Sequence, residues 1–313
     1  MKRSHAELLL MTVIILRSTS YLCSKVGLDS LPPLELLAIR FSLAFVILAV
    51  IFRKRIEMTL TRQVLHNAVI MGGLLSACMS CELISLTMIN SSTAAFLENT
   101  AVVWVLLLGA LRHRRLPNKL TGACTLAIFC GIALLTLRGT AFQFSLGEGI
   151  CLCASLFYAV WLLATNTLSR QSDPLVLGIV QFGVLACFTG IGAVLFETPV
   201  LPAQPIEWEV ILVLTFVCTI FGFTFQPVAQ RYTTAEKAGL FSALNPLVAA
   251  ILGWLVLQEE MGLPQIAGST LILTGIILLQ TVGKEKEGTA KNTATPKLPK
   301  IGTAKVNGQP SGQ

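Results

Sequence analysis

Four ionisable side chains lie within long apolar segments of this chain: Arg17, Arg40, Glu82 and Glu98. A charge at the centre of a membrane helix costs roughly 2.5–3.5 kcal/mol on insertion scales, so such residues commonly mark transport pathways or proton relays. Arg17 has the charge to hold a carboxylate. Arg40 and Glu98 each lie about 10 Å from the same membrane edge, which predicts either a structural ion pair between facing helices or a proton-binding site at Glu98. Glu82 is expected nearer the surface, at the level of the lipid headgroups.

Two asparagines occupy equivalent places in segments that resemble each other. Asn99 follows Glu98, and Asn245 precedes Pro246. Because proline removes one backbone hydrogen bond from a helix, a kink at Asn245 would expose polar backbone inside the membrane. Both asparagines are therefore candidate substrate-binding residues, and a kink that serves helix packing alone is the simpler alternative.

Two aromatic residues in the second half of the chain are further candidates. Tyr158 aligns with Arg17 when the two halves are superposed in sequence, and Trp161 follows Tyr158 by about one helical turn. Such side chains often lie at membrane interfaces or against lipid. The pattern therefore leaves open whether they face a substrate.

The sequence carries no signature of an enzyme or a metal site. It has no Walker loop, nucleophile elbow or HExxH motif. Its nine cysteines lie in apolar segments, without the second pair that a four-ligand zinc site needs. The net charge of +7 fits basic residues gathered in cytoplasmic loops better than a nucleic-acid surface. We therefore expect no catalysis, no metal, no cofactor and no nucleic-acid partner.

Membrane-spanning helices must position the candidate residues. The 313 residues are 54% hydrophobic and only 12% charged, whereas a soluble domain carries about 25% charged residues. The apolar residues form blocks long enough to cross about 30 Å of hydrocarbon as helices. We predict an all-α membrane protein with ten transmembrane helices, at approximately residues 7–26, 33–52, 65–86, 91–111, 119–137, 147–168, 174–196, 208–228, 235–257 and 263–282.

Basic residues set the predicted orientation. With the N-terminus inside, most lysines and arginines fall in cytoplasmic connections, and the external loops are acidic. We expect a multi-pass protein of the cell membrane, plasma or inner, with both termini cytoplasmic. Residues 283–313 are rich in Lys, Thr, Pro and Gly and have no apolar face, which predicts a disordered cytoplasmic tail.

The spans form two copies of one unit. Residues 91–122 resemble residues 237–268, and Arg40 aligns with Gln181. The basic connections of the first copy correspond to acidic connections of the second. Because an odd number of spans inverts the second copy in the membrane, we predict two inverted five-helix repeats, an arrangement found in many transporters, at residues 1–140 and 141–282.

Taken in order, these features resemble the EamA-type family of the drug/metabolite transporter superfamily. LPPLELLAIRF at 31–41 is similar to the family's Pro…Arg-Phe signature, and LNPLVAAILGWLVLQEE at 244–260 is similar to its Pro-containing ninth span and Glu-ending hinge. The resemblance implies a ten-helix bundle around a cavity lined mainly by spans 1, 3, 4, 6, 8 and 9. It also implies export or exchange of amino acids, nucleobase-like compounds and other small metabolites. Two positions depart from the family pattern: Arg17-Ser18 stands where it has Trp-Gly, and His113 where its first hinge has Glu.

We therefore predict a secondary transporter that moves a small polar metabolite, such as an amino acid or organic anion, outward or by exchange through alternating access. Expected partners are this small-molecule substrate and membrane lipid, with a coupling proton and a homodimer as open alternatives. A non-transporting membrane scaffold or lipid-binding protein is the alternative from another class. The candidates for substrate binding are Arg17, Glu98, Asn99, Tyr158, Trp161 and Asn245, and those for helix pairing or proton coupling are Arg40 and Glu98.

Overall fold

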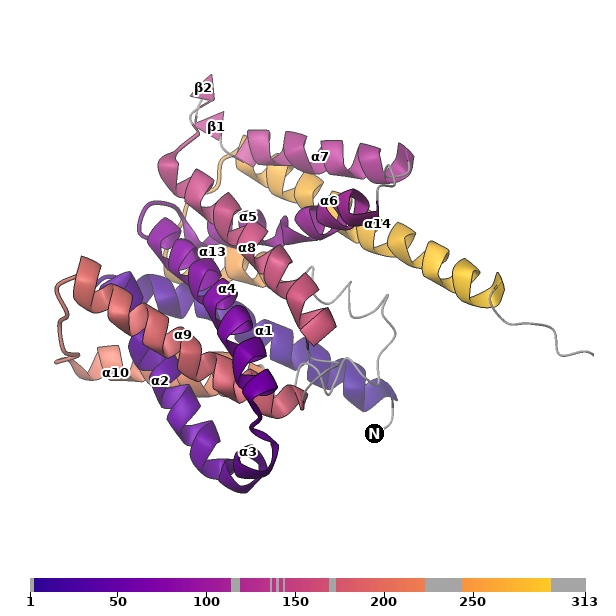
Figure 1. Ribbon diagram of the computed structural model, residues 1–313. Coiled ribbons are helices and arrows are strands. Elements are labelled where there is room, and N and C mark those ends of the chain that lie inside the picture. The colour runs from indigo at the N-terminus through magenta and orange to yellow at the C-terminus, as the bar shows by residue number, and fades with distance from the viewer. Residues whose placement is uncertain are drawn as a thin grey trace, which may run out of the picture.

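The computed structural model describes residues 3–113, 119–135, 137–138, 141–142, 144–168, 173–222 and 244–293, and helices dominate them (Figure 1). Six helical segments are long and apolar enough to cross a membrane, and shorter apolar helices accompany them. The prediction of an all-α membrane protein of about ten helices is confirmed. Most predicted spans are single helices, namely α1 (Arg3–Gly27), α2 (Pro33–Ile51), α4 (Arg62–Leu86), α7 (Lys119–Leu135), α8 (Leu146–Leu168), α9 (Pro174–Phe196) and α14 (Leu263–Thr293).

One predicted span is divided into two helices. The segment predicted at 91–111 forms α5 (Ser91–Asn99) and α6 (Ala101–His113), with the break at Thr100. The break directly follows two of the candidate residues. Interrupted membrane helices leave backbone groups available to side chains or ligands. The hydrophobic pattern does not predict this break, because the segment contains no proline or glycine near it.

The eighth and ninth spans also depart from one regular α-helix. The eighth begins as α10 (Pro205–Val213) and continues in π-helical geometry as η2 (Leu214–Phe221). The described part of the ninth is α13 (Leu244–Val256). Pro246 is the third residue of the described part of α13. The residues before Leu244, where the predicted kink would show, lie outside the described ranges.

Equivalent helices of the two repeats pack against each other. In Figure 1, α2 lies along α9 and α7 lies along α14, on either side of a centre made by α1, α4, α5, α8, η2 and α13. The α7–α14 backbones touch, because a Cβ atom added to Gly268 would lie 2.5 Å from the carbonyl oxygen of Gly131. Small residues permit such close approach of membrane helices.

The connections add features that the span pattern does not contain. A short helix, α3 (Arg53–Thr59), follows α2, and two strands, β1 (Leu137–Arg138) and β2 (Ala141–Phe142), pair antiparallel at the predicted boundary between the repeats. Helix α14 continues to Thr293, so the predicted start of the disordered tail at residue 283 is too early. The added turns contain a Lys-Glu-Lys-Glu run, whose residues are good helix formers, and no proline.

Candidate functional site

Ionisable side chains from four helices meet at the centre of the bundle. Glu82 of α4 lies close enough for its charge to interact with Arg17 of α1, Arg40 of α2 and Glu98 of α5, and Glu98 interacts in turn with Arg17. Such charges interact more strongly in a protein interior than in water. Two tyrosines join them, and we call the whole set the central polar cluster: Arg17, Tyr21, Arg40, Glu82, Glu98 and Tyr158.

A tyrosine that the sequence analysis missed holds Glu98. The Tyr21 hydroxyl donates a hydrogen bond to Glu98 Oε2, and Arg17 is the cation whose charge acts on this carboxylate. Tyr21 follows Arg17 by four residues and therefore lies on the same face of α1. That spacing is the sequence signal that could have identified it.

Arg40 is bound elsewhere and does not pair with Glu98. Its Nε donates to Thr219 Oγ1 of η2 at 2.8 Å, and its Nη1 donates to Ser20 Oγ of α1 at 3.3 Å. The predicted Arg40–Glu98 ion pair is therefore not formed. Equal depth in the membrane places two residues in one plane but does not fix the direction in which each helix turns its side chains.

Arg17 and Tyr158, which align in the two repeats, meet in the structure. The Arg17 guanidinium lies close enough to the Tyr158 hydroxyl for the two groups to interact. The aliphatic part of Arg17 lies against Gly222 after η2, where an added Cβ atom would be 2.7 Å from Arg17 Cγ. The absent side chain at Gly222 thus leaves room for Arg17 between the two halves.

Glu82 is buried inside the bundle and does not face the lipid headgroups, whereas its expected depth near the outer surface stays a prediction. Its exposed fraction is 7%, and its Oε2 has no hydrogen-bond partner among the described residues. Distance from the end of a helix predicts depth but not lateral position. Helix α4 packs against α2, α5, α8 and α9, so a side chain near its end is still covered by protein.

The two equivalent asparagines differ in what they contact. Ser18 Oγ of α1, next to Arg17, donates to Asn245 Oδ1 of α13 at 2.8 Å. Asn99 Nδ2 instead donates to the carbonyl oxygen of Ala95 in its own helix, at 3.1 Å. The structure therefore brings Asn245 to the helix that carries Arg17, whereas Asn99 supports the last turn of α5.

Trp161 packs against Tyr158 of the central polar cluster. Its Nε1 donates to Gln181 Oε1 of α9 at 3.3 Å, and its ring stacks on that of Tyr158 with 5.5 Å between centroids. The indole N–H is engaged and the side chain is buried. Trp161 therefore joins α8 to α9 and positions Tyr158.

A carboxylate from the second repeat holds the start of α5 in the first. Glu259, in the Glu-ending hinge after α13, accepts hydrogen bonds from the Ser91 amide at 2.6 Å, the Ser92 amide at 3.1 Å and Ser92 Oγ at 2.7 Å. Anions are stabilised at helix N-termini by the exposed amides and the helix dipole. This contact joins the two halves at the end predicted to be external.

The α2–α9 pair is tied at both of its ends. Glu197, after α9, accepts from the Leu34 and Glu35 amides at the start of α2, at 2.9 and 3.0 Å. At the opposite end Arg55 of α3 pairs with Asp173, the N-cap of α9, at 2.8 Å. Burial raises the pKa of Asp173, but hydrogen bonds from Arg55 and from two backbone amides of α9 outweigh it, so the net pKa lies below its ordinary value.

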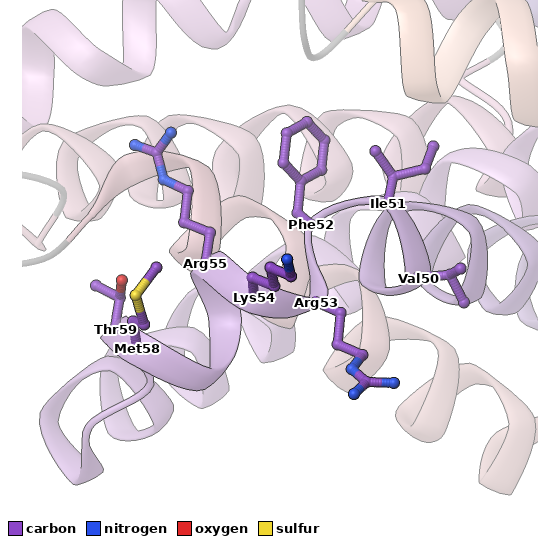
Figure 2. Close-up of a pocket in the computed structure, with 8 residues that line it drawn as sticks. All are labelled: Val50, Ile51, Phe52, Arg53, Lys54, Arg55, Met58 and Thr59. Atoms are coloured by element: carbon purple, nitrogen blue, oxygen red, sulfur yellow. The ribbon is translucent and has the colours of Figure 1, made fainter.

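A surface groove of about 710 Å³ lies where α2 turns into α3, formed by one stretch of chain between Val50 and Thr59 (Figure 2). In Figure 2 Arg53 and Arg55 point to opposite sides of this stretch, and their ion pairs are with Glu57 and Asp173. The residues of the central polar cluster do not line the groove. We assign it to the predicted cytoplasmic surface and not to a substrate site.

The chemistry of the central polar cluster is that of charge and hydrogen bonding. Within the described ranges no group of three or more His, Cys, Asp or Glu side chains is arranged to hold a metal ion. All nine cysteines are free thiols, and Cys78, Cys151 and Cys218 are buried, where a thiol packs as a small apolar group. A guanidinium can bind a carboxylate, and a carboxyl can bind a proton or an ammonium group.

Comparison with known families matches the chain twice to one family model. The EamA-like transporter family matches residues 5–137 and again residues 145–281. Each match falls within one of the two predicted repeats.

Individual relatives and a solved structure are similar over nearly the whole chain. An uncharacterized transporter of Archaeoglobus fulgidus is 24% identical over 283 residues, which cover 88% of this chain and 97% of that protein. An Escherichia coli protein named "Probable amino-acid metabolite efflux pump" is 26% identical over 284 residues, 86% of this chain and 93% of that one. A crystal structure of another protein superposes with a TM-score of 0.63 at 19% identity, covering 91% of this chain and 100% of that chain, which supports the fold.

Proposed function

Because the chain belongs to the EamA-like transporter family, we propose that it is a secondary carrier that exports or exchanges small carboxylate-bearing metabolites by alternating access. The observation that carries this proposal is the contact between Arg17 and Tyr158. It joins equivalent positions of two inverted repeats, and such an interface can be exposed to either face of the membrane in turn. The guanidinium at this interface can bind a carboxylate through two parallel hydrogen bonds.

The surroundings of Arg17 favour a small polar substrate. Glu98 can accept a hydrogen bond from an ammonium group, and the linked pair Ser18 and Asn245 adds neutral polar groups. An amino acid would use both the cationic and the anionic side of the cluster. The name of the Escherichia coli relative, which refers to amino-acid metabolites, supports amino acids as the first probes.

The contacts between the halves suggest how residues 1–140 and 141–282 would rock. Helices α2 and α9 are tied at both ends, so they serve as the axis. The carboxylate of Glu259 holds α5 at one end only. In this mechanism Glu259 releases the start of α5 when the predicted external end of the bundle opens.

The proposed setting is the cell membrane, plasma or inner, with both termini cytoplasmic and lipid around the outer helix faces. Large apolar side chains such as Phe188, Leu195 and Trp254 are exposed on those faces, as contact with lipid requires. Accessibility of single cysteines placed at either terminus to an impermeant thiol reagent tests the orientation. The homodimer stays a prediction, which the mass of the purified protein–detergent complex tests.

Counterflow in proteoliposomes tests the transport function. Liposomes loaded with unlabelled L-serine, L-glutamate or succinate receive the same compound in radiolabelled form outside, and wild-type protein should exchange at least one of them. Arg17→Ala and Glu98→Gln should lose this exchange, whereas Arg53→Ala, which removes a surface ion pair with Glu57, should keep it. Exchange unchanged in the first two variants would remove both assignments, and no exchange by wild type would count against the substrate class.

A further inference from the structure

We propose that Glu82 binds a coupling proton and that this proton crosses the membrane together with the substrate carboxylate, an inference that rests on the transport function proposed above. The juxtaposition behind it is a buried carboxyl oxygen without a hydrogen-bond donor, placed beside a second carboxyl and two arginines. Ionisable residues buried within membrane helices commonly serve as proton carriers.

The immediate surroundings of Glu82 suit a carboxylic acid better than a carboxylate. Oε2 is buried and has no donor among the described residues. A buried charged oxygen without a hydrogen bond is costly, and the neutral acid costs far less. The hydrogen bonds that Arg40 donates go to Thr219 and Ser20, so Arg40 acts on Glu82 through its charge alone.

The groups around Glu82 come from every helix that packs on α4 near the cluster. Helix α9, which also packs on α4, places Gln181 against Gly72, ten residues before Glu82. Lys25 of α1 is engaged with the carbonyl oxygens of Leu86, the last residue of α4, and of Ile89 just after it. With both arginines and both glutamates ionised, the four charges of the cluster sum to zero. The titratable or charged groups that act on Glu82 or respond to it are Arg17 and Tyr21 of α1, Arg40 of α2, Cys78 of α4, Glu98 of α5 and Cys151 of α8.

The two carboxyl groups have different environments, which assigns them different roles. Glu98 accepts a hydrogen bond from Tyr21 and faces Arg17, which are the partners of an ionised carboxylate. Glu82 lacks such a donor at Oε2 among the described residues. When two neighbouring titratable groups differ in this way, the environment separates the one that holds a proton from the one that stays charged.

Charge balance couples the proton to the substrate. A substrate with a net negative charge, such as L-glutamate, adds that charge at Arg17 to a cluster whose charges sum to zero, and a proton on Glu82 offsets one unit of it. A zwitterionic amino acid adds no net charge. An O–H bond forms at Glu82 with a proton from water on the open side and breaks when the proton is released to water on the other side, with no electron transfer. Each ligand therefore favours binding of the other, and both move in the same direction. Export then runs down an outward gradient of the substrate and carries the proton out with it.

A comparison of exchange with pH-driven uptake tests the coupling. In the proteoliposomes described above, an acidic outside should drive net accumulation by wild type of L-glutamate or succinate, the two probes with a net negative charge. Glu82→Gln mimics the permanently protonated residue, so uptake by this variant should no longer respond to the pH difference across the membrane. The control Glu148→Gln changes a buried carboxylate that caps the start of α8, and it should retain both activities. Uptake by Glu82→Gln that still responds to the pH difference would overturn the proposal.

Infrared difference spectroscopy tests Glu82 without any substrate. The purified wild-type protein should show a carboxylic-acid carbonyl band at neutral pH that is lost in Glu82→Gln and present in Glu82→Asp, Glu98→Gln and Glu148→Gln. A band unchanged in Glu82→Gln would contradict the proposal. Because this readout needs no transport, it stands even if wild type exchanges none of the three probes, so the two failures can be told apart.

Discussion

The first two helices of each repeat are joined by a polar contact at equivalent positions, but the chemistry of the two contacts differs. In the first repeat Arg40 of α2 donates to Ser20 of α1 at 3.3 Å. In the second, Trp161 of α8 donates to Gln181 of α9, also at 3.3 Å. Arg40 aligns with Gln181, and the same register places Ser20 on Trp161. The donor lies on the second helix of the first repeat but on the first helix of the second repeat. The first repeat has a charged guanidinium where the second has a neutral amide.

The difference shows that a fold with two similar halves can have a site whose charged residues come from one half only. Arg17 faces its own counterpart, Tyr158, and Glu98 corresponds to Leu244 in the repeat alignment. The repeats therefore share the helix contacts, while the first supplies the charges of the central polar cluster. Two kinds of variant test whether the charges of the first repeat set it apart. Some give one repeat the residue of the other, and some destabilise a helix contact in one repeat only.

The largest expected effect is that of Arg40→Gln, which gives the first repeat the residue of the second. It removes a cation that acts on the buried carboxyl of Glu82 and leaves Thr219 and Ser20 without their donor. Hydrogen bonds made by a charged group are worth about 1.5–3 kcal/mol each. The unfolding midpoint in detergent should fall steeply, and a midpoint equal to wild type would contradict the role of Arg40.

A smaller loss is expected from Gly268→Leu, at the contact between the last helices of the two repeats. A Cβ atom at this position would lie 2.5 Å from the backbone oxygen of Gly131, so the helices must separate. Overpacking typically costs about 1–3 kcal/mol. The matched control is Gly178→Leu in α9, where an added Cβ atom has open space. Equal unfolding midpoints for the two variants would show that the close approach of α7 and α14 is unimportant.

Gln181→Leu should cost less than Arg40→Gln, because it removes a neutral acceptor. The Trp161 N–H loses its partner, and hydrogen bonds between membrane helices are worth about 0.6–1.7 kcal/mol. Unfolding of both variants in the same detergent sharpens the comparison of the repeats. If Gln181→Leu were the more destabilising of the two, the charge would not be what distinguishes the first repeat.

The smallest effect concerns Asp173 and depends on pH. Because the pKa of Asp173 is lower in the folded protein than its ordinary value of about 3.9, its stabilisation is present above that ordinary value and is lost as the pH falls through the folded-state pKa. Asp173→Asn keeps a capping residue but removes the ion pair with Arg55, which is worth about 0–1 kcal/mol. The difference in unfolding free energy between wild type and Asp173→Asn should be greatest near neutral pH and vanish in acid. A difference that grows on acidification would contradict the pairing.

The span pattern predicted the helices well because each apolar block carries its own signal of length and depth. That signal placed α2, α8 and α9 within a few residues of their observed bounds. It could not show the break at Thr100 or the π-helical turn of η2. Both depend on how neighbouring helices pack, and neither follows from the local sequence.

The site predictions that failed used only the depth of a residue along its helix and not the direction of its side chain. Arg17 and Tyr158 occupy equivalent positions in the two repeats. Repeat symmetry relates both their depth along the helix and the direction of their side chains. The expected Arg40–Glu98 pair rested on depth without rotation. The burial of Glu82 among neighbouring helices was not predicted, because lateral burial has no signal in one sequence. Tyr21 was overlooked although its four-residue spacing from Arg17 places both on one helix face.

The central claim, that the halves move against each other around α2 and α9, is tested most directly by cross-linking. In a variant without native cysteines, Ser92→Cys with Glu259→Cys is joined by a short bifunctional thiol reagent, and Arg55→Cys with Asp173→Cys is joined in a second protein. The account predicts that the first cross-link, across the contact that must release, stops counterflow until it is cleaved, whereas the second, on the axis, leaves counterflow intact. Undiminished exchange through the Ser92→Cys–Glu259→Cys cross-link would contradict it.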